Sequence, residues 1–116
     1  YPNQIGYFTK NISANKFELL KKISNLQLTV LGTQHNIFQE LPQTHLSLQG
    51  NFSNDLLTIP EKSDFLSALK EYIDLCQSYD VRQRAGWIAS LDHGVQKITP
   101  ETNIHLFIDQ IRTKLA

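Results

Sequence analysis

A complete strand–loop–helix unit occupies residues 86–115, which read GWIASLDHGVQKITPETNIHLFIDQIRTKL. Residues 86–91 form a short apolar run, which predicts a buried strand. Thr99-Pro100-Glu101 then places a proline in the first turn of a helix, where the N–H that proline lacks has no intrahelical partner. The face of this helix expected to point inward carries Ile104, Phe107, Ile108, Ile111 and Leu115.

The same alternation of strand and helix recurs toward the N-terminus. Short apolar runs at residues 4–9, 28–31 and 46–49 predict strands, and Gly32 and Gly50 end the last two. Strands that alternate with helices predict one continuous α/β unit over residues 1–116, with four parallel strands. Because the strands are apolar throughout, we expect both faces of the sheet to be covered.

Helices are expected after each of these earlier strands. Ser13 is the predicted N-cap of the first, residues 36–41 form a short second one that stops at Pro42, and Pro60 opens the clearest helix. The predicted apolar faces of the first and third helices are Phe17, Leu19, Leu20 and Ile23, and then Phe65, Leu69, Tyr72, Ile73 and Cys76.

The composition excludes several classes of protein. Eleven basic and 11 acidic residues cancel, so nothing indicates binding to nucleic acid or to a membrane surface. No apolar run approaches the roughly 20 residues that cross a bilayer. The single cysteine, Cys76, excludes an internal disulfide and a thiolate metal cluster, and favours a reducing, cytoplasmic compartment. The chain has no methionine and begins at Tyr1, from which we expect a fragment of a longer protein or a processed chain.

Ligands in parallel α/β folds bind at the carboxyl ends of the strands, so the loops found there are the candidate site. Those loops offer Thr9, Lys10 and Asn11, then Thr33, Gln34 and His35, then Gln49, Gly50 and Asn51, and finally Asp92, His93 and Gly94. Polar side chains at exposed strand ends are also expected without any function.

His93 is the strongest candidate, because it directly follows an apolar strand and has the flexible Gly94 behind it. Among the other histidines, His45 lies at the amino end of its strand, His105 adjoins the apolar stripe of the last helix, and His35 lies in a loop at the favoured end.

Three further groups of residues have simpler explanations than function. Arg82 and Arg84 precede a strand and belong to the opposite, stability end of the sheet. Cys76 lies on a core stripe, and Trp87 is expected to pack in the interior.

Several segments, in order, resemble the C-terminal part of uroporphyrinogen decarboxylases. They are Ile5-Gly6-Tyr7-Phe8-Thr9-Lys10, Leu31-Gly32, Ser47-Leu48-Gln49-Gly50-Asn51, Leu56-Leu57 with Pro60, Ser90-Leu91-Asp92-His93-Gly94-Val95, and Thr99-Pro100-Glu101 with Asn103 and Phe107. The resemblance implies the C-terminal half of a TIM-type (β/α)₈ barrel. It also implies a decarboxylase without cofactor or metal, which converts the acetate side chains of uroporphyrinogen to methyl groups and yields coproporphyrinogen in haem biosynthesis.

The resemblance assigns roles to three residues of the strand ends. His93 corresponds to the family's histidine of the final strand, so we assign it to catalysis, as electrostatic support, and to substrate binding; Asn51 and Lys10 are assigned to substrate binding. The family's arginines, aspartate and tyrosine come from the other half of the barrel. We therefore expect this chain alone not to catalyse, and its open sheet to associate with the missing half or as a homo-oligomer, a dimer.

This sequence departs from the family pattern at three places. In the family an Asp-Pro pair normally follows Gln-Gly-Asn, but here Asn51 leads into Phe52-Ser53-Asn54-Asp55. Asp92 replaces the glycine before the histidine, and Thr33 stands where an acid usually follows the glycine of the second strand. These departures leave the substrate open, and two alternatives remain. One is the branch of zinc-dependent methyltransferases that act on cobalamin-linked substrates, and the other is a non-enzymatic, flavodoxin-like binding module.

Overall fold

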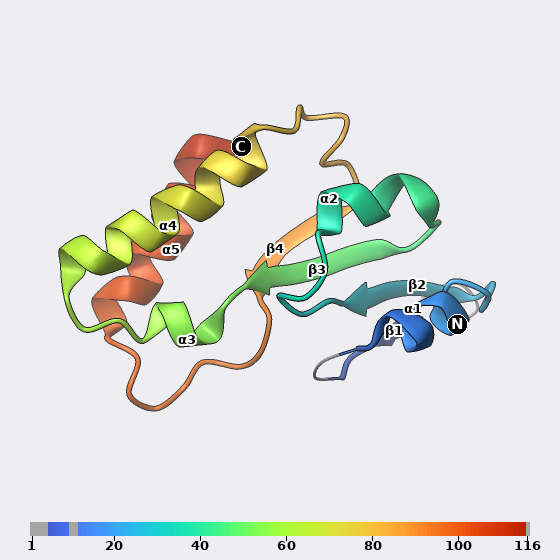
Figure 1. Ribbon diagram of the computed structural model, residues 1–116, viewed down its shortest axis with the longest axis horizontal. Coiled ribbons are helices and arrows are strands. Elements are labelled where there is room, and N and C mark those ends of the chain that lie inside the picture. Colours follow the sequence, from blue (N-terminus) through green and yellow to red (C-terminus); the bar gives the residue numbers. More distant parts are fainter. Residues whose placement is uncertain (1–4, 10–11, 116) are drawn as a thin grey trace.

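Four parallel strands form one sheet in the order in which they occur along the chain. The computed structural model describes residues 5–9 and 12–115 (Figure 1). The strands are β1 (Ile5–Tyr7), β2 (Leu26–Val30), β3 (Ser47–Phe52) and β4 (Trp87–Leu91). A flavodoxin-like sheet has its first two strands exchanged, so the order β1-β2-β3-β4 contradicts that alternative and matches the sequential winding of a (β/α)₈ barrel.

Helical segments connect the strands and follow the last one. They are α1 (Ala14–Leu20), α2 (Ile37–Glu40) with the 3₁₀ helix η1 (Leu41–Gln43), α3 (Asn54–Leu57), α4 (Lys62–Gln77) and α5 (Glu101–Leu115). The predicted cap of α1 is confirmed, because Ser13 Oγ accepts a hydrogen bond from the Lys16 N–H at 3.1 Å. Pro42 does not stop the second helical segment; it lies inside η1, where its fixed φ is tolerated.

Two buried clusters hold the helices against the sheet. The first joins α1 and α2 to β2 and β3 around Phe17, Leu31 and Leu48. The second joins α3, α4 and α5 to the carboxyl end of β3, with Phe52 and Phe65 at its centre. Figure 1 shows α4 and α5 side by side at the end of the molecule toward which β3 and β4 point. The described residues hold no helix long and apolar enough to cross a membrane.

The largest correction to the predicted elements concerns β3. The strand does not end before Gly50 but continues to Phe52, and Asn51 pairs with Ser90 of β4. The strand can continue through position 50 because the residue there is glycine. Its φ of +135° is one that glycine adopts readily, and a Cβ at this position would lie 2.5 Å from the main-chain oxygen of Leu31. The glycine therefore allows a close approach of two strands where the sequence indicated a strand end.

Smaller corrections concern element ends and helix faces. β2 begins at Leu26 rather than residue 28, and α4 begins at Lys62, one residue after its cap, rather than at Pro60. Three residues expected on apolar helix faces are exposed instead, and these are Leu19, Ile23 and Ile108. Because α1 ends at Leu20, the last of its expected face lies beyond the helix.

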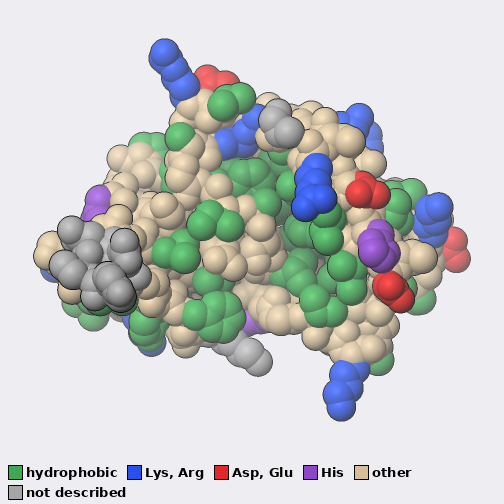
Figure 2. Space-filling model, turned by 180° about the vertical axis from the view of Figure 1, so that it is seen from behind, with side chains coloured by type: hydrophobic (Ala, Val, Ile, Leu, Met, Phe, Trp, Pro, Cys, Tyr) green, Lys and Arg blue, Asp and Glu red, His purple; other side chains and the backbone are tan. Residues whose placement is uncertain are grey.

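The described residues cover one face of the sheet more fully than the other, whereas the apolar strands predicted that both faces would be covered. In β3, Leu48, Gly50 and Phe52 are buried, whereas the alternate residues are half-buried. On the same side as those half-buried residues, Gln49 Nε2 donates to Ser90 Oγ at 3.3 Å, and Ile88 is 44% exposed. Seen from behind, the molecule shows hydrophobic side chains among polar ones in the middle of its surface (Figure 2).

Candidate functional site at the strand ends

The carboxyl ends of β2, β3 and β4 meet at one edge of the sheet, as parallel pairing requires. Phe52 pairs with Leu91, and the Asp92 N–H continues the ladder to the Phe52 carbonyl oxygen at 2.8 Å. The predicted loop residues of these strands therefore do lie at a common edge. Their side chains, however, serve different purposes.

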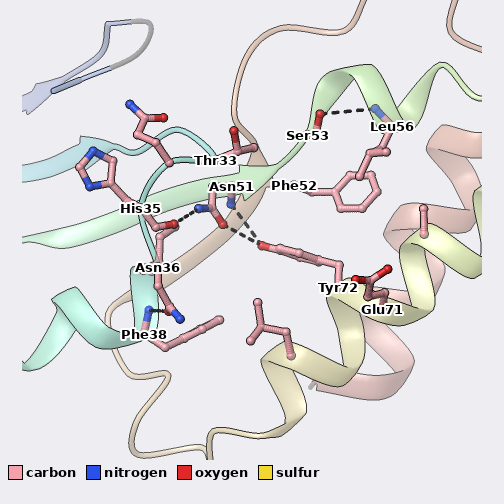
Figure 3. A pocket seen from close by; sticks show the side chains of 14 residues that line it. Thr33, His35, Asn36, Phe38, Asn51, Phe52, Ser53, Leu56, Glu71 and Tyr72 are labelled. Atoms are coloured by element: carbon pink, nitrogen blue, oxygen red, sulfur yellow. Dashed lines mark hydrogen bonds between the residues drawn. The ribbon is translucent and has the colours of Figure 1, made fainter. Parts of the chain in front are cut away.

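Asn51 holds the neighbouring loop in place. Its Nδ2 donates to the carbonyl oxygens of Gly32, at 3.0 Å, and His35, at 2.7 Å (Figure 3). Both amide hydrogens are thus used within the protein, and a substrate could reach only the Oδ1 atom of this side chain. The assignment of Asn51 to substrate binding stays a prediction; its contacts make it the residue that fixes the β2–α2 loop.

Tyr72, from α4, supports Asn51 from the other side. The Asn51 N–H donates to Tyr72 Oη at 3.2 Å, and Tyr72 Oη lies 3.5 Å from both the Gly50 carbonyl oxygen and Asn51 Oδ1. Burial raises the pKa of Tyr72 above its ordinary value, and the neighbouring Cys76 raises it further. The phenol therefore stays protonated and keeps both a donor and an acceptor at this point. Helical spacing placed Tyr72 correctly on the buried face but gave no sign of its hydroxyl's partners.

His93 follows β4 as predicted, but it is mostly buried. Its Nε2 lies 4.0 Å from Asp92 Oδ2, and its buried Nδ1 has no hydrogen-bond partner among the described residues. A buried ring nitrogen without a partner is uncommon in folded proteins. Nδ1 also has almost no exposed surface, so only another part of the imidazole, which is 17% exposed as a side chain, can meet a ligand.

Asp92 has a clear structural role. Its side chain is nearly buried, and Oδ1 accepts a hydrogen bond of 2.7 Å from the Asn54 N–H at the start of α3. Asn54 in turn donates from Nδ2 to the Gly94 carbonyl oxygen at 3.0 Å. These two contacts tie the loop after β4 to the loop after β3 on either side of His93. The acid that departs from the family pattern thus bonds to the backbone.

A cleft of about 630 Å³ opens beside the strand ends. One wall comes from the β2–α2 loop and α2, the floor from the end of β3, and the other wall from α3 and α4 (Figure 3). His35 and Asn51 line it, whereas His93 does not. Among the described residues, the structure therefore brings Asn51 and His35 into one cleft, and His93 is not part of its lining.

The resemblance seen in the sequence is confirmed by comparison with known families. The model of the family "Uroporphyrinogen decarboxylase (URO-D)" matches residues 3–114. The chain belongs to the uroporphyrinogen decarboxylase family. A search of curated proteins gave no significant match. The four-stranded parallel sheet with its helices is consistent with part of a TIM-barrel-like URO-D fold.

Positive charge at the strand ends of this URO-D family member is sparse. Lys10, the cation assigned to substrate binding, lies outside the described residues. The β4–α5 loop carries an exposed lysine, Lys97, which strand-end position did not indicate because it lies several residues beyond the end of β4. No arginine lies in the loops after β2, β3 or β4.

The remaining candidates lie away from this edge. His45 Nε2 is 2.9 Å from the Leu26 carbonyl oxygen at the amino end of the sheet, and the exposed His105 pairs with Glu101. Arg84 donates to the Cys76 carbonyl oxygen, and Trp87 Nε1 donates to the Gly50 carbonyl oxygen at 2.7 Å, so both have structural roles.

Cys76 is the only thiol of the chain, and it belongs to the core. Its side chain is buried on α4, and burial raises the pKa of the thiol to about 11. A thiol in this state is a poor metal ligand, because the thiolate is the form that binds metals. The described residues hold no group of 3 or more His, Cys, Asp or Glu side chains that could bind a metal ion.

Proposed function

We propose that this chain forms the C-terminal half of a barrel that decarboxylates the acetate side chains of uroporphyrinogen to give coproporphyrinogen. The observation that carries the proposal is the match to the URO-D family over residues 3–114, with His93 at the carboxyl end of the last parallel strand. Family membership alone supports a decarboxylase-type activity. The finer assignment of the substrate rests on the motif around His93.

His93 acts in this proposal as a binding and electrostatic group. A neutral imidazole donates from one ring nitrogen and accepts at the other, and a protonated one donates from both. The His93 side chain is 17% exposed, so a substrate carboxylate or pyrrole N–H would contact the exposed part of the ring and not the buried Nδ1 atom. The contacts of Asp92 and Gly94 with Asn54 fix the loop on both sides and so limit the motion of the imidazole.

The chain needs a second half to act on such a substrate. Uroporphyrinogen carries many carboxylates, and burying them costs free energy unless cations pair with them. The described strand-end loops supply only Lys97 as a permanent cation. We therefore propose that the other half of the barrel supplies the remaining cationic side chains that pair with the substrate carboxylates. The half-covered sheet, with its exposed Ile88, supports association with that half or with a second copy. A cytoplasmic location stays part of this proposal.

The test is the activity of the complete barrel with His93 replaced. We expect His93→Ala to lower kcat/KM for uroporphyrinogen by about 10²-fold, the order of magnitude that loss of one positioned electrostatic group costs. His105→Ala is the matched control, because His105 is exposed on α5 and should leave the rate unchanged. Coproporphyrinogen is measured as the oxidised porphyrin by chromatography with fluorescence detection. Equal rates for the two variants, with circular dichroism showing both folded, would remove His93 from the site.

A further inference from the structure

No residue of the loop after β4, His93 included, lines the cleft beside the strand ends. Its volume of about 630 Å³ lies within the range of small-molecule pockets, about 300–1,000 Å³. It lies between α2 and α4, beside the end of β3 (Figure 3). A ligand here would leave the strand-end loop of β4 free.

The walls of the cleft are fixed before any ligand binds. Asn51 joins the β2–α2 loop to β3 through the His35 carbonyl oxygen, and Tyr72 joins β3 to α4. Asn36 caps α2 by accepting from the Phe38 N–H at 3.0 Å, which holds the far wall. Side-chain hydrogen bonds thus connect the elements on both sides, and a preformed cleft loses less entropy on binding.

The interior of the cleft is mainly apolar and open to water. Leu56 and Leu75 line it and remain 39% and 45% exposed, although both are large hydrophobic residues. Phe38 stands on the opposite wall. An alkyl or aryl group placed here would remove apolar surface from water mainly at Leu56 and Leu75, because Phe38 is only 4% exposed already.

The charge at the cleft has one sign. Among the described residues, Glu71 is the only acidic side chain that lines it, and no lysine or arginine does. Glu71 is exposed and lies on α4 next to Tyr72 (Figure 3). A carboxylate ligand would be repelled there, whereas an ammonium group would be attracted.

We propose that this cleft binds a small amphiphilic cation, with its alkyl or aryl body between Leu56 and Leu75 and its ammonium group at Glu71. The site differs in charge preference from a site for a polycarboxylate porphyrinogen, and the proposal does not depend on the decarboxylase activity. It requires only the cleft and its single acidic side chain.

Three probes of equal chain length test the charge preference. n-Hexylammonium, n-hexanol and hexanoate are titrated separately into the ¹⁵N-labelled chain, and the amide shifts are followed by NMR. We expect saturable shifts at the cleft residues, with n-hexylammonium binding about five-fold tighter than n-hexanol, the effect of one exposed charge pair in water, and hexanoate weakest. Glu71→Gln should make n-hexylammonium bind like n-hexanol, while Glu101→Gln, on α5, should change nothing.

A second pair of variants tests the location. Ala68 lines the cleft, so Ala68→Trp should fill it and abolish binding of all three probes. Ser67→Trp adds the same side chain at the exposed neighbouring position and should leave binding intact. With the unmodified chain, three results each overturn the proposal: shifts centred outside the cleft, no saturable shift, or equal binding of n-hexylammonium and hexanoate. Binding that survives Glu71→Gln with its charge preference unchanged also overturns it, whether or not the Ala68 variant folds.

Discussion

Replacing Gly50 with alanine tests how β3 reaches the strand-end site. Gly50 has a φ of +135°, and an added Cβ would lie 2.5 Å from the Leu31 main-chain oxygen and 3.4 Å from Ile37 Cδ1. The backbone strain costs about 1–3 kcal/mol, and forcing an atom into a packed site costs about 1–3 kcal/mol more. Since the nearest atom belongs to the backbone, little of this cost can be relieved by a side-chain rotation. We therefore expect Gly50→Ala to lower the free energy of unfolding by about 3 kcal/mol or more, a large part of a domain's stability of about 5–15 kcal/mol.

The assay is urea denaturation followed by circular dichroism and by the fluorescence of Trp87, the single tryptophan, which packs edge-on against Phe38. Gly94→Ala is the control, because a Cβ at Gly94 meets no atom within 4 Å, and its effect should stay within about 0.5 kcal/mol. Gly86→Ala should fall between them, since its φ of +90° is strained but the nearest atom, Leu41 Cδ2 at 3.3 Å, can move. Equal midpoints and slopes for the Gly50 and Gly94 variants would refute the close approach of β3 to the end of β2.

Three other changes have expected outcomes. Asn103→Ala should lower the free energy of unfolding by about 1–3 kcal/mol, measured by urea denaturation. The reason is that the buried Asn103 Nδ2 donates to the carbonyl oxygens of Leu57 (2.9 Å) and Ile59 (2.8 Å). An unchanged midpoint would contradict these contacts. Asp92→Ala should lower the free energy of unfolding by about 1.5–3 kcal/mol, because the hydrogen bond from the Asn54 N–H is lost. Asp92→Asn should lower it less, because the amide oxygen still accepts that bond. Equal losses of stability in the two variants would exclude the bond. Burial raises the pKa of the Cys76 thiol from 9.0 to about 11, so the unfolded chain releases this proton at lower pH than the folded chain. Stability should therefore fall as the pH rises from 9 toward about 11. Cys76→Ala should make the fall between pH 9 and 10 shallower, below the range in which the buried Tyr72 adds a fall of its own; the same slope in both proteins would contradict it.

The parallel order of the strands could be predicted because the sequence repeats apolar runs with helical patterns between them. The end of β3 could not, because a glycine that permits a close strand approach looks the same in sequence as one that ends a strand. The helix α3 spans only Asn54–Leu57 and is too short to show a period of 3.6, so Ser53, which caps it, was the only available signal.

The candidate site was predicted only in part, because the sequence shows which residues follow each strand but not which atoms their side chains contact. Strand ends and their polar residues follow from the chain order, which placed His93, Asn51 and His35 at the same edge of the sheet. The partner of each side chain depends on contacts between distant segments, such as that of Asn51 with the His35 carbonyl oxygen. The sequence therefore could not show that Asn51 and His35 line the cleft and that His93 does not.

The most direct measurement of the central claim is the mass of the product formed by the complete barrel from uroporphyrinogen. The proposed function predicts stepwise loss of carbon dioxide from the acetate side chains, with coproporphyrinogen as the final species and no dependence on added zinc. A substrate that keeps all its carboxyl groups, or a methyl group transferred in a zinc-dependent reaction, would contradict the decarboxylase assignment.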